Sequence, residues 1–212
     1  MLDITTILTG PFSTNTYILW NGDTKEAALV DPCADVGFVT GRIKEAGLSV
    51  KAILLTHGHF DHNFAAGTFA KKLKAPVYMD EKDLELIPIY LEEAINFGFD
   101  RSEYAEYDGY TFLSDGDTLP LLGEDIRVLE APGHTKGSLV YIASAGALCG
   151  DVIFRESIGR YDLWGGSEEE LMNSIKNKIL TLPDSTVLYP GHGSRTTVGY
   201  ERANNPYLLF MS

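Results

Sequence analysis

The stretch Thr56-His57-Gly58-His59-Phe60-Asp61-His62 decides the fold. It follows an apolar run over residues 52–55 that predicts a buried strand, and a helical pattern follows it from about residue 63 to residue 73. Side chains two positions apart on an extended backbone point to the same side, so His57 and His59 can reach one cation. Asp61 and His62, at the turn into the helix, can face a second cation close by. The spacing therefore predicts a metal centre.

Three later loops supply further ligand-type residues, each after a β-rich run. They are Pro132-Gly133-His134, Gly150-Asp151 and Pro190-Gly191-His192. The carboxyl ends of strands in α/β sheets gather at one edge, so we expect these loops to meet there. The alternatives are that the histidines are scattered structural residues and that Asp61 is only a helix N-cap. All five histidines of the chain lie in these motifs, which favours the metal centre.

The rest of the chain alternates between strand and helix patterns. Strands are predicted over residues 4–8, 16–20, 27–30, 52–55, 76–79, 118–121, 126–130, 139–142, 147–149 and 186–189, with a hairpin turn at Asn21-Gly22. Helices are predicted after Asp35 up to Gly47, over residues 63–73, and after Ser167, where Glu170 completes a capping-box signature, up to Pro183. Two halves of this kind predict an α/β fold with two sheets face to face and helices outside.

One segment fits this pattern less well. Residues 81–112 are acidic and aromatic with weaker periodicity, and we interpret them as a helical insertion near the entrance to the site. A solvated surface helix with a few core anchors explains the same composition. The length of 212 residues predicts a single domain over 1–212.

Composition limits the partners. The net charge of -13, with no clustered Lys or Arg patch, argues against nucleic acid. Met1-Leu2-Asp3-Ile4 has no basic segment followed by an apolar one, and no stretch is apolar enough to span a bilayer, so we expect no membrane partner and a cytoplasmic location. Cys33 and Cys149 are interpreted as small buried thiols, although Cys149 is also a candidate soft metal ligand.

The motif T-H-x-H-x-D-H with the later G-H-T, G-D and P-G-H-G resembles the metallo-β-lactamase fold superfamily over nearly the whole chain. The resemblance implies an αββα four-layer sandwich of two mixed β-sheets. It also implies two divalent ions, zinc first with iron or manganese as alternatives. One ion would be held by His57, His59 and His134, the other by Asp61, His62 and His192, and Asp151 would bridge the two.

Within that superfamily, Gly150-Asp151-Val152-Ile153-Phe154 and Gly159-Arg160-Tyr161-Asp162 resemble the short bacterial glyoxalase II-like group. The resemblance implies a small-molecule thioester substrate such as a hydroxyacylglutathione, bound by Arg160 and Tyr161. Only twenty residues follow His192, so we expect no separate C-terminal helical domain of the kind that helps longer relatives hold glutathione.

A hydroxide bridging two ions would attack the thioester carbonyl, with Asp61 as the catalytic residue that orients it. Two enzymes of the same fold remain as alternatives. One is a persulfide dioxygenase with a single iron on His57, His134 and Asp151. The other is a lactonase, whose pocket residues 81–112 would shape. A binding module with a vestigial site is a third reading, but all seven ligand positions are filled. The oligomeric state stays open between monomer and homodimer.

Overall fold

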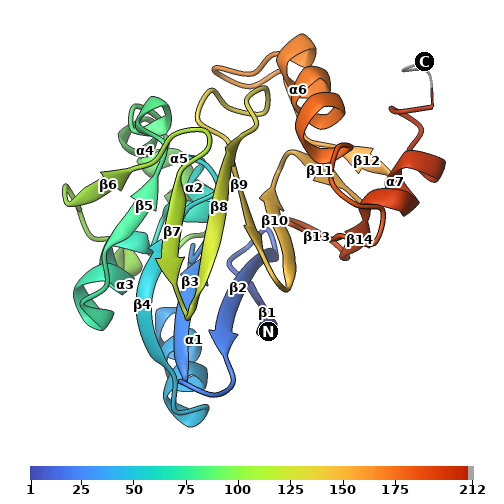
Figure 1. Ribbon diagram of the computed structural model, residues 1–212. Coiled ribbons are helices and arrows are strands. Elements are labelled where there is room, and N and C mark those ends of the chain that lie inside the picture. Colours follow the sequence, from blue (N-terminus) through green and yellow to red (C-terminus); the bar gives the residue numbers. More distant parts are fainter. Residues whose placement is uncertain (210–212) are drawn as a thin grey trace.

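The structure, a computed structural model, describes residues 1–209 apart from the side chain of Pro88. Its framework is two six-stranded sheets (Figure 1). The first has the order β1 (Leu2–Thr9), β2 (Thr14–Asn21), β3 (Glu26–Val30), β4 (Ser49–Leu54), β5 (Val77–Met79) and β6 (Tyr110–Phe112). The second has the order β14 (Thr196–Thr197), β13 (Val187–Pro190), β10 (Gly146–Gly150), β9 (Leu139–Ala143), β8 (Glu124–Glu130) and β7 (Thr118–Leu121). A small ribbon joins β11 (Ile153–Phe154) to β12 (Ser157–Ile158).

Both large sheets are mixed. In the first, β1, β2 and β3 pair antiparallel, whereas β3, β4, β5 and β6 run parallel. In the second, β7 to β10 pair antiparallel, β13 joins β10 in parallel, and β14 closes the edge antiparallel. Because β8, β10 and β13 therefore point the same way, the loops after their carboxyl ends lie at one edge.

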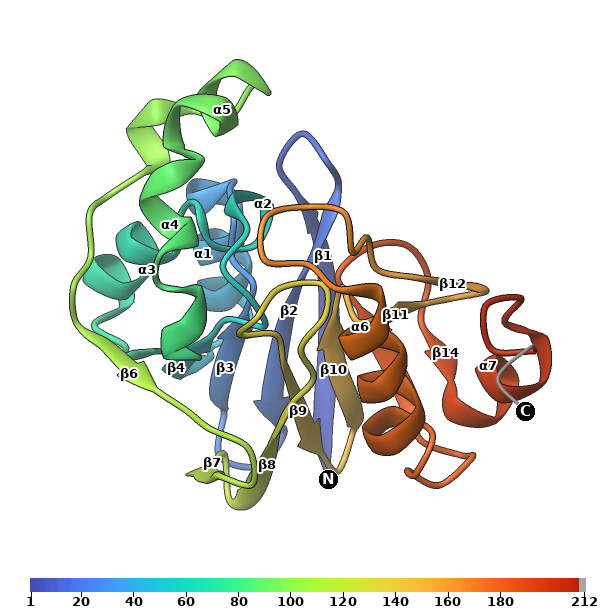
Figure 2. The same ribbon diagram turned by 90° about the horizontal axis from the view of Figure 1, so that it is seen from above.

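The helices lie outside the sheets. On the chain they are α1 (Val36–Glu45), α2 (Phe60–Asn63), α3 (Ala66–Leu73), η1 (Glu81–Asp83), α4 (Leu86–Ile89), α5 (Leu91–Asn96), η2 (Arg101–Glu103), α6 (Glu168–Ser174), the π-helical turn η3 (Ile175–Ile179) and α7 (Val198–Asn204). In the view from above, α1 and α3 lie beyond the first sheet and α6 beyond the second (Figure 2). Within residues 1–209, no helix combines the length and apolar character needed to cross a bilayer.

Three buried clusters define the layers. Leu54 of the first sheet and Tyr141 of the second share the central cluster, so the sheets pack face to face. A second cluster joins Ile53 to Phe69 of α3 on the outer face of the first sheet. A third joins the second sheet to α6 through Leu171. The predicted αββα sandwich is confirmed, and the second half of β4, residues 52–54, is apolar and buried because neighbours in this fold cover both of its faces.

Some predicted boundaries are wrong. The helix expected over residues 63–73 is two helices, α2 and α3, with a break at Phe64 and Ala65. The side-chain amide of Asn63 donates to the carbonyls of Gly58 (2.5 Å) and His59 (2.9 Å), which ties the end of α2 to the preceding loop. The helix expected up to Pro183 ends at Ile179 and widens into a π-turn. Ser167 caps it as predicted, accepting from the amide of Glu170.

The stretch over residues 81–112 contains the short helices α4 and α5 and ends in β6. Strand β6 was not expected, because three residues are too few for an alternating pattern to be recognised. Its position is fixed by pairing: Val77 lies opposite Tyr110 and Met79 opposite Phe112. The chain thus leaves the first sheet after β5, forms the helices and returns to the edge of the same sheet.

Phe69 tests the packing of the outer layer. Its side chain is fully buried between α3 and the first sheet. We expect Phe69→Ala to lower the free energy of unfolding by about 3–5 kcal/mol, because a large cavity remains in a close-packed layer. Phe38→Ala on α1 is the control, since Phe38 is 60% exposed and should change stability by less than about 0.5 kcal/mol. Urea denaturation measures both, and equal effects of the two substitutions would contradict this assignment.

Candidate metal centre

The seven predicted ligands come together in the space where loops of the two sheets meet. His57 follows β4, His134 follows β8, Asp151 follows β10 and His192 follows β13. Asp61 and His62 lie in α2, whose N-cap is His59, so Asp61 occupies the first turn of the helix and is not its N-cap. Three overlapping groups can be drawn from these residues in which the candidate ligand atoms all lie within 4.8 Å of one another.

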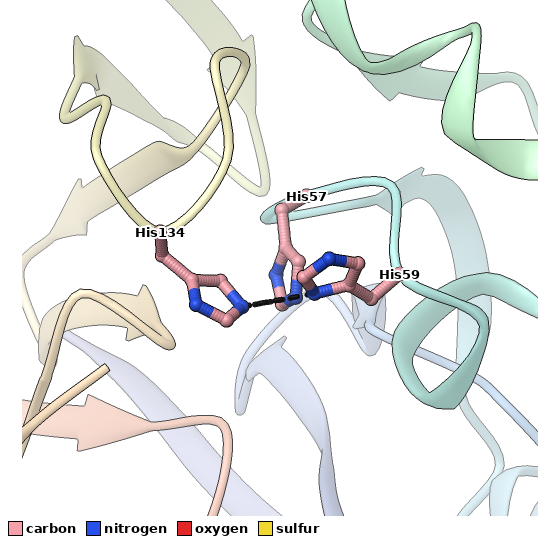
Figure 3. A group of neighbouring side chains, drawn as sticks. All are labelled: His57, His59 and His134. Carbon is pink, nitrogen blue, oxygen red and sulfur yellow. Dashed lines mark hydrogen bonds between the residues drawn. The ribbon is translucent and has the colours of Figure 1, made fainter. Parts of the chain in front are cut away.

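The first group is formed by His57, His59 and His134, whose rings converge on one point (Figure 3). His134 Nε2 lies 2.9 Å from His59 Nδ1 and 3.2 Å from His57 Nε2. Nitrogen ligands about 2.0–2.1 Å from a tetrahedral ion lie roughly 3.3 Å from one another. The spacing of the three imidazoles is therefore close to that of a tetrahedral site.

In His134 and His57, a hydrogen bond at the far side of the ring fixes which nitrogen faces the centre with a lone pair. His134 Nδ1 donates to the carbonyl of Arg160 (2.7 Å), which can only accept. Thr56 Oγ1 donates its proton to Asp31 (2.6 Å), so it accepts from His57 Nδ1 (3.0 Å). Both Nε2 atoms consequently present lone pairs to each other at 3.2 Å. Two facing lone pairs repel unless a cation lies between them.

The second group is formed by Asp61, His62 and His192. His192 Nε2 lies 3.2 Å from Asp61 Oδ2, and His62 Nε2 lies 3.8 Å from the same oxygen. His62 Nδ1 donates to Asp31 Oδ2 (2.9 Å), which directs its Nε2 toward the centre. This group offers two imidazoles and a carboxylate, ligands suited to borderline divalent ions.

Asp151 lies between the two groups. Its Oδ1 is 3.4 Å from His62 Nε2, and its Oδ2 is 3.7 Å from both His134 Nε2 and His192 Nε2. One carboxylate therefore contacts a ligand of the first group and two of the second. This is the geometry expected of a bridging ligand between two ions.

Unpartnered polar atoms test whether ions fit here. Among residues 1–209, four buried side-chain polar atoms have no hydrogen-bond partner, and three of them are His59 Nε2, His62 Nε2 and Asp151 Oδ1. Leaving such atoms unpaired costs about 1–3 kcal/mol each. His62 Nε2 and Asp151 Oδ1 face each other across the centre, so one cation would satisfy both. The residues present fit divalent metal ions.

Burial keeps the first group neutral. It lowers the pKa of His59 to about 3, and the neighbouring His134 adds to this effect. It lowers the pKa of His134 to about 4, although the bond to the Arg160 carbonyl favours the charged ring. The pKa of His57 falls well below its usual value through burial and the nearby histidines. Neutral imidazoles are the form that binds a cation.

In the second group, the nearby carboxylates favour the charged form of the two histidines. Burial alone would lower the pKa of His62, but Asp151, Asp61 and Asp31 outweigh it and raise the pKa to about 10. Burial likewise opposes the charge on His192, yet the hydrogen bond to Asp61 raises its pKa. Burial would raise the pKa of Asp61, but His62 and His192 hold it well below its ordinary range. Without an ion, the second group is a protonated ion-pair cluster.

Sequence reasoning missed two supporting aspartates, and Asp31 is the first. It lies after β3 and is buried, and its carboxylate accepts from the amide of Thr56 (2.8 Å), from Thr56 Oγ1 and from His62 Nδ1. It therefore orients His62 directly and His57 through Thr56. The only signal in the sequence was Asp31-Pro32 after an apolar run, which is equally typical of a turn.

Asp83, in η1, is the second missed residue. Its buried carboxylate accepts from the amide of Gly58 (2.8 Å), the amide of Gly137 (2.7 Å) and the hydroxyl of Thr135 (2.6 Å). Gly58 lies between two ligands of the first-sheet loop, and Thr135 follows His134 in a second-sheet loop. One carboxylate thus ties together the loops that carry the first group. Burial raises its pKa above the usual carboxyl value.

Glycines permit the close approach of these loops. A Cβ on Gly191 would clash with Asp151 Oδ1 and His62 Cε1. Gly133 has a φ of 129°, and a Cβ there would overlap the backbone of Leu171 in α6. The residue before each of the histidines His134 and His192 therefore has to be glycine.

The two predicted substrate-binding residues, Arg160 and Tyr161, lie in different surroundings. Arg160 lines a cavity of about 520 Å³ in front of the metal centre, but its guanidinium pairs with Asp162 through bonds of 2.9 and 3.0 Å. Tyr161 packs against the apolar cluster beneath α6 and is not among the described residues that line this cavity. The structure places Arg160 beside the centre and Tyr161 away from it.

Comparison with known proteins agrees with this arrangement. Residues 9–192 match the Metallo-beta-lactamase superfamily. The chain belongs to this superfamily. A relative from Haemophilus influenzae, named hydroxyacylglutathione hydrolase GloC, is 37% identical over 93% of each chain. The crystal structure of BLEG-1, a B3 metallo-beta-lactamase, has a TM-score of 0.86 at 36% identity, covering 97% of this chain and 99% of that one. TTHA1623 in a di-iron-bound form has a TM-score of 0.83 at 34% identity, covering 96% of this chain and 100% of that one.

Membership of the metallo-β-lactamase superfamily and the fit of these residues to divalent ions together identify the chain as a metal-binding member of a metallo-hydrolase superfamily. Both cysteines are buried, free thiols. Cys149 Sγ donates to the carbonyls of Ile153 and Tyr189 and belongs to none of the three ligand groups found among residues 1–209. The interpretation of the cysteines as small buried thiols agrees with these contacts.

Asp31→Ala tests how the ligands are held. We expect the substitution to weaken zinc binding by about 10- to 100-fold, because His62 loses its hydrogen-bond acceptor and His57 loses the Thr56 relay. Competition with a chromogenic chelator measures the affinity. Asp125→Ala is the control, since Asp125 is exposed on β8. Wild-type affinity in Asp31→Ala would contradict the orienting role.

Proton release distinguishes the two groups. The first group is already neutral at pH 7, whereas the second carries protons on His62, whose pKa is about 10. The first ion should therefore bind with little proton release and an affinity that is flat from about pH 6 to pH 8. The second should displace at least one proton and bind more tightly as pH rises. Calorimetric titration in buffers of different ionisation enthalpy counts the protons, and equal release for both ions would rule out this difference.

Proposed function

We propose that this protein is a dinuclear metallohydrolase that cleaves a small-molecule thioester, of the glyoxalase II-like type. The observation that carries the proposal is the sharing of Asp151 between two complete ligand groups. Ligands of both groups, His59, His134, Asp61 and His192, also line the cavity of about 520 Å³. A substrate in that cavity would lie directly against both ions.

Two divalent ions supply Lewis-acid activation of water and of the substrate carbonyl when they are bound. His57, His59 and His134 would hold one of them, Asp61, His62 and His192 the other, and Asp151 both. Zinc is the first choice because imidazoles and carboxylates without a thiolate suit this borderline ion, and iron and manganese are the alternatives. Iron is included because the similar protein TTHA1623 is named in a di-iron-bound form.

The residues of the chain point to water as the nucleophile. Burial raises the pKa of Cys33 to about 12 and that of Cys149 still further, so neither thiol is a thiolate at neutral pH. Neither of them lines the cavity. Asp61 belongs to the second group, stays ionised and lines the cavity, so its carboxylate can accept a hydrogen bond from the attacking water and orient it.

The same ionised Asp61 favours a leaving group that departs without a proton. A carboxylate whose pKa is held low is a poor proton donor, whereas a leaving amine or alkoxide needs one. Thiols have pKa values near 8.5 and depart as thiolates. The relative named hydroxyacylglutathione hydrolase agrees with a thioester, while BLEG-1, named a B3 metallo-beta-lactamase, makes a β-lactam a necessary comparison.

A persulfide dioxygenase with one iron is the second candidate. The two imidazoles and the carboxylate that it would use lie together, with His134 Nε2 3.2 Å from His57 Nε2 and 3.7 Å from Asp151 Oδ2. It leaves Asp61, His62 and His192 without a role, although they form a complete second group. A lactonase would use both groups and differ in the cavity wall.

A substrate panel tests the proposed function. Protein loaded with two zinc ions should hydrolyse S-lactoylglutathione or an acyl thioester of N-acetylcysteamine faster than an acyl lactone or a β-lactam, and without consuming oxygen on glutathione persulfide. Removal of the ions should abolish the activity, and Asp61→Asn should reduce kcat by at least about 100-fold, because the water loses its acceptor. Activity is followed by thiol release and oxygen by an electrode. One iron per chain with oxygen uptake would overturn the proposal in favour of the dioxygenase.

A further inference from the structure

The cavity in front of the metal centre has an aromatic wall, made of Phe12, Phe60, Tyr90 and Phe97. Phe60 lies between the ligands His59 and Asp61 in the sequence, so the wall begins directly at the metal centre. The Phe60 and Phe97 rings stack with centroids 6.0 Å apart, and Phe12 meets Phe97 edge to face at 5.2 Å. The wall is therefore one continuous apolar surface.

Three separate segments build this wall. Phe12 lies in the turn between β1 and β2, Phe60 begins α2, and Phe97 follows α5. In the view from above, the tip of the β1–β2 hairpin lies beside α5 (Figure 2). The buried ring of Phe99 supports the wall from behind, with centroids 6.2 Å from Phe12 and 5.5 Å from Phe60. The rings are consequently held in place before any ligand arrives.

Two members of the wall are exposed to an unusual degree for phenylalanine. Phe12 is 40% exposed and Phe97 is 49% exposed. Exposed apolar surface beside a site with polar groups at its base is characteristic of a ligand cavity. Because this wall continues into the metal centre, the molecule that it binds is the one that would react there.

The cavity has few charged residues besides the candidate metal ligands. Among the described residues that line it, Arg160 is the only Lys or Arg, and Asp162 already pairs with its guanidinium. Glu93, the one lining acid outside the ligand set, would repel a carboxylate. A substrate whose acyl group carried a negative charge would meet no free cation at the wall.

We propose that the aromatic wall binds an apolar acyl group, so that the substrates are thioesters of medium-length or aromatic carboxylic acids rather than of small hydroxy acids. This inference rests on the proposed function and narrows it. Phe12 and Phe97 are then specificity-determining residues. Burying each additional methylene of the acyl chain against the wall should raise kcat/KM by about three- to fourfold until the wall is covered.

The test is an acyl series on one carrier. N-acetylcysteamine thioesters from acetyl to octanoyl, and a phenylacetyl thioester, are assayed with the zinc-loaded protein. We expect kcat/KM to rise by at least about 30-fold from acetyl to hexanoyl, mostly through KM. Phe97→Ala and Phe12→Ala should each reduce this ratio by about tenfold, because each removes part of the apolar surface that the longer acyl chain covers.

Phe112→Ala is the matched control. Phe112 is 41% exposed, lies on β6 and is not among the described residues lining the cavity, so its loss should leave the ratio unchanged. A flat acyl series overturns the inference, as does a preference that follows the thiol rather than the acyl group. A change in sedimentation of Phe12→Ala or Phe97→Ala with an unaltered acyl ratio would show a subunit interface instead and also overturn it.

Binding of the carboxylic acid products separates this inference from the proposed function. Calorimetry on the zinc-loaded protein should show hexanoate binding at least about tenfold more tightly than acetate, with the difference lost in Phe97→Ala. If no thioester is cleaved but this difference is found, the proposed function fails and the apolar site stands. If thioesters are cleaved and hexanoate shows no advantage, the inference fails and the proposed function stands.

Discussion

The mutual orientation of lone pairs at the metal centre is the constraint on which the rest of the structure depends. His57 and His134 each donate from Nδ1 to an acceptor behind the ring, so their Nε2 atoms face each other with no proton between them. His62 Nε2 and Asp151 Oδ1 are buried beside them without a partner. Buried polar atoms without partners oppose folding unless cations satisfy them. A metal site therefore explains why these loops bring their ligand atoms so close together.

Docking of the two sheets is coupled to this centre. Asp31 ties His62 and, through Thr56, His57 to the end of β3, while Asp83 ties the loop after β4 to the loop after β8. Both carboxylates are buried and fully used as acceptors. The fold therefore holds the ligand atoms in place by hydrogen bonds rather than by packing alone, which is how a site of fixed geometry is kept on loops.

The sequence was most informative where a short-range pattern carries the information. The apolar run before His57 and the H-x-H-x-D-H spacing predicted the strand, the presence of a helix after it and the candidate ligands, because strand and helix periods act over a few residues. Asp31 and Asp83 could not be found this way, since their partners lie 25 to 54 residues away. The break between α2 and α3 likewise depends on Asn63 reaching back to the loop, which helical periodicity does not record. Strands β6 and β14 are ordered by their neighbours and carry too few residues for a pattern of their own.

The cavity adds an aromatic wall to the metal centre, and two of the three segments that form it, the β1–β2 turn and the chain around α5, lie outside the ligand motifs. Under the proposed function, most of the residues that select the substrate would therefore lie outside the motifs that hold the ions. The most direct test of the central claim is anomalous diffraction from crystals of the zinc-loaded protein at the zinc edge. Two peaks about 3.5–4 Å apart, one on His57, His59 and His134, the other on Asp61, His62 and His192, with Asp151 touching both, are predicted. A single peak, or imidazoles turned away from one another, would contradict it.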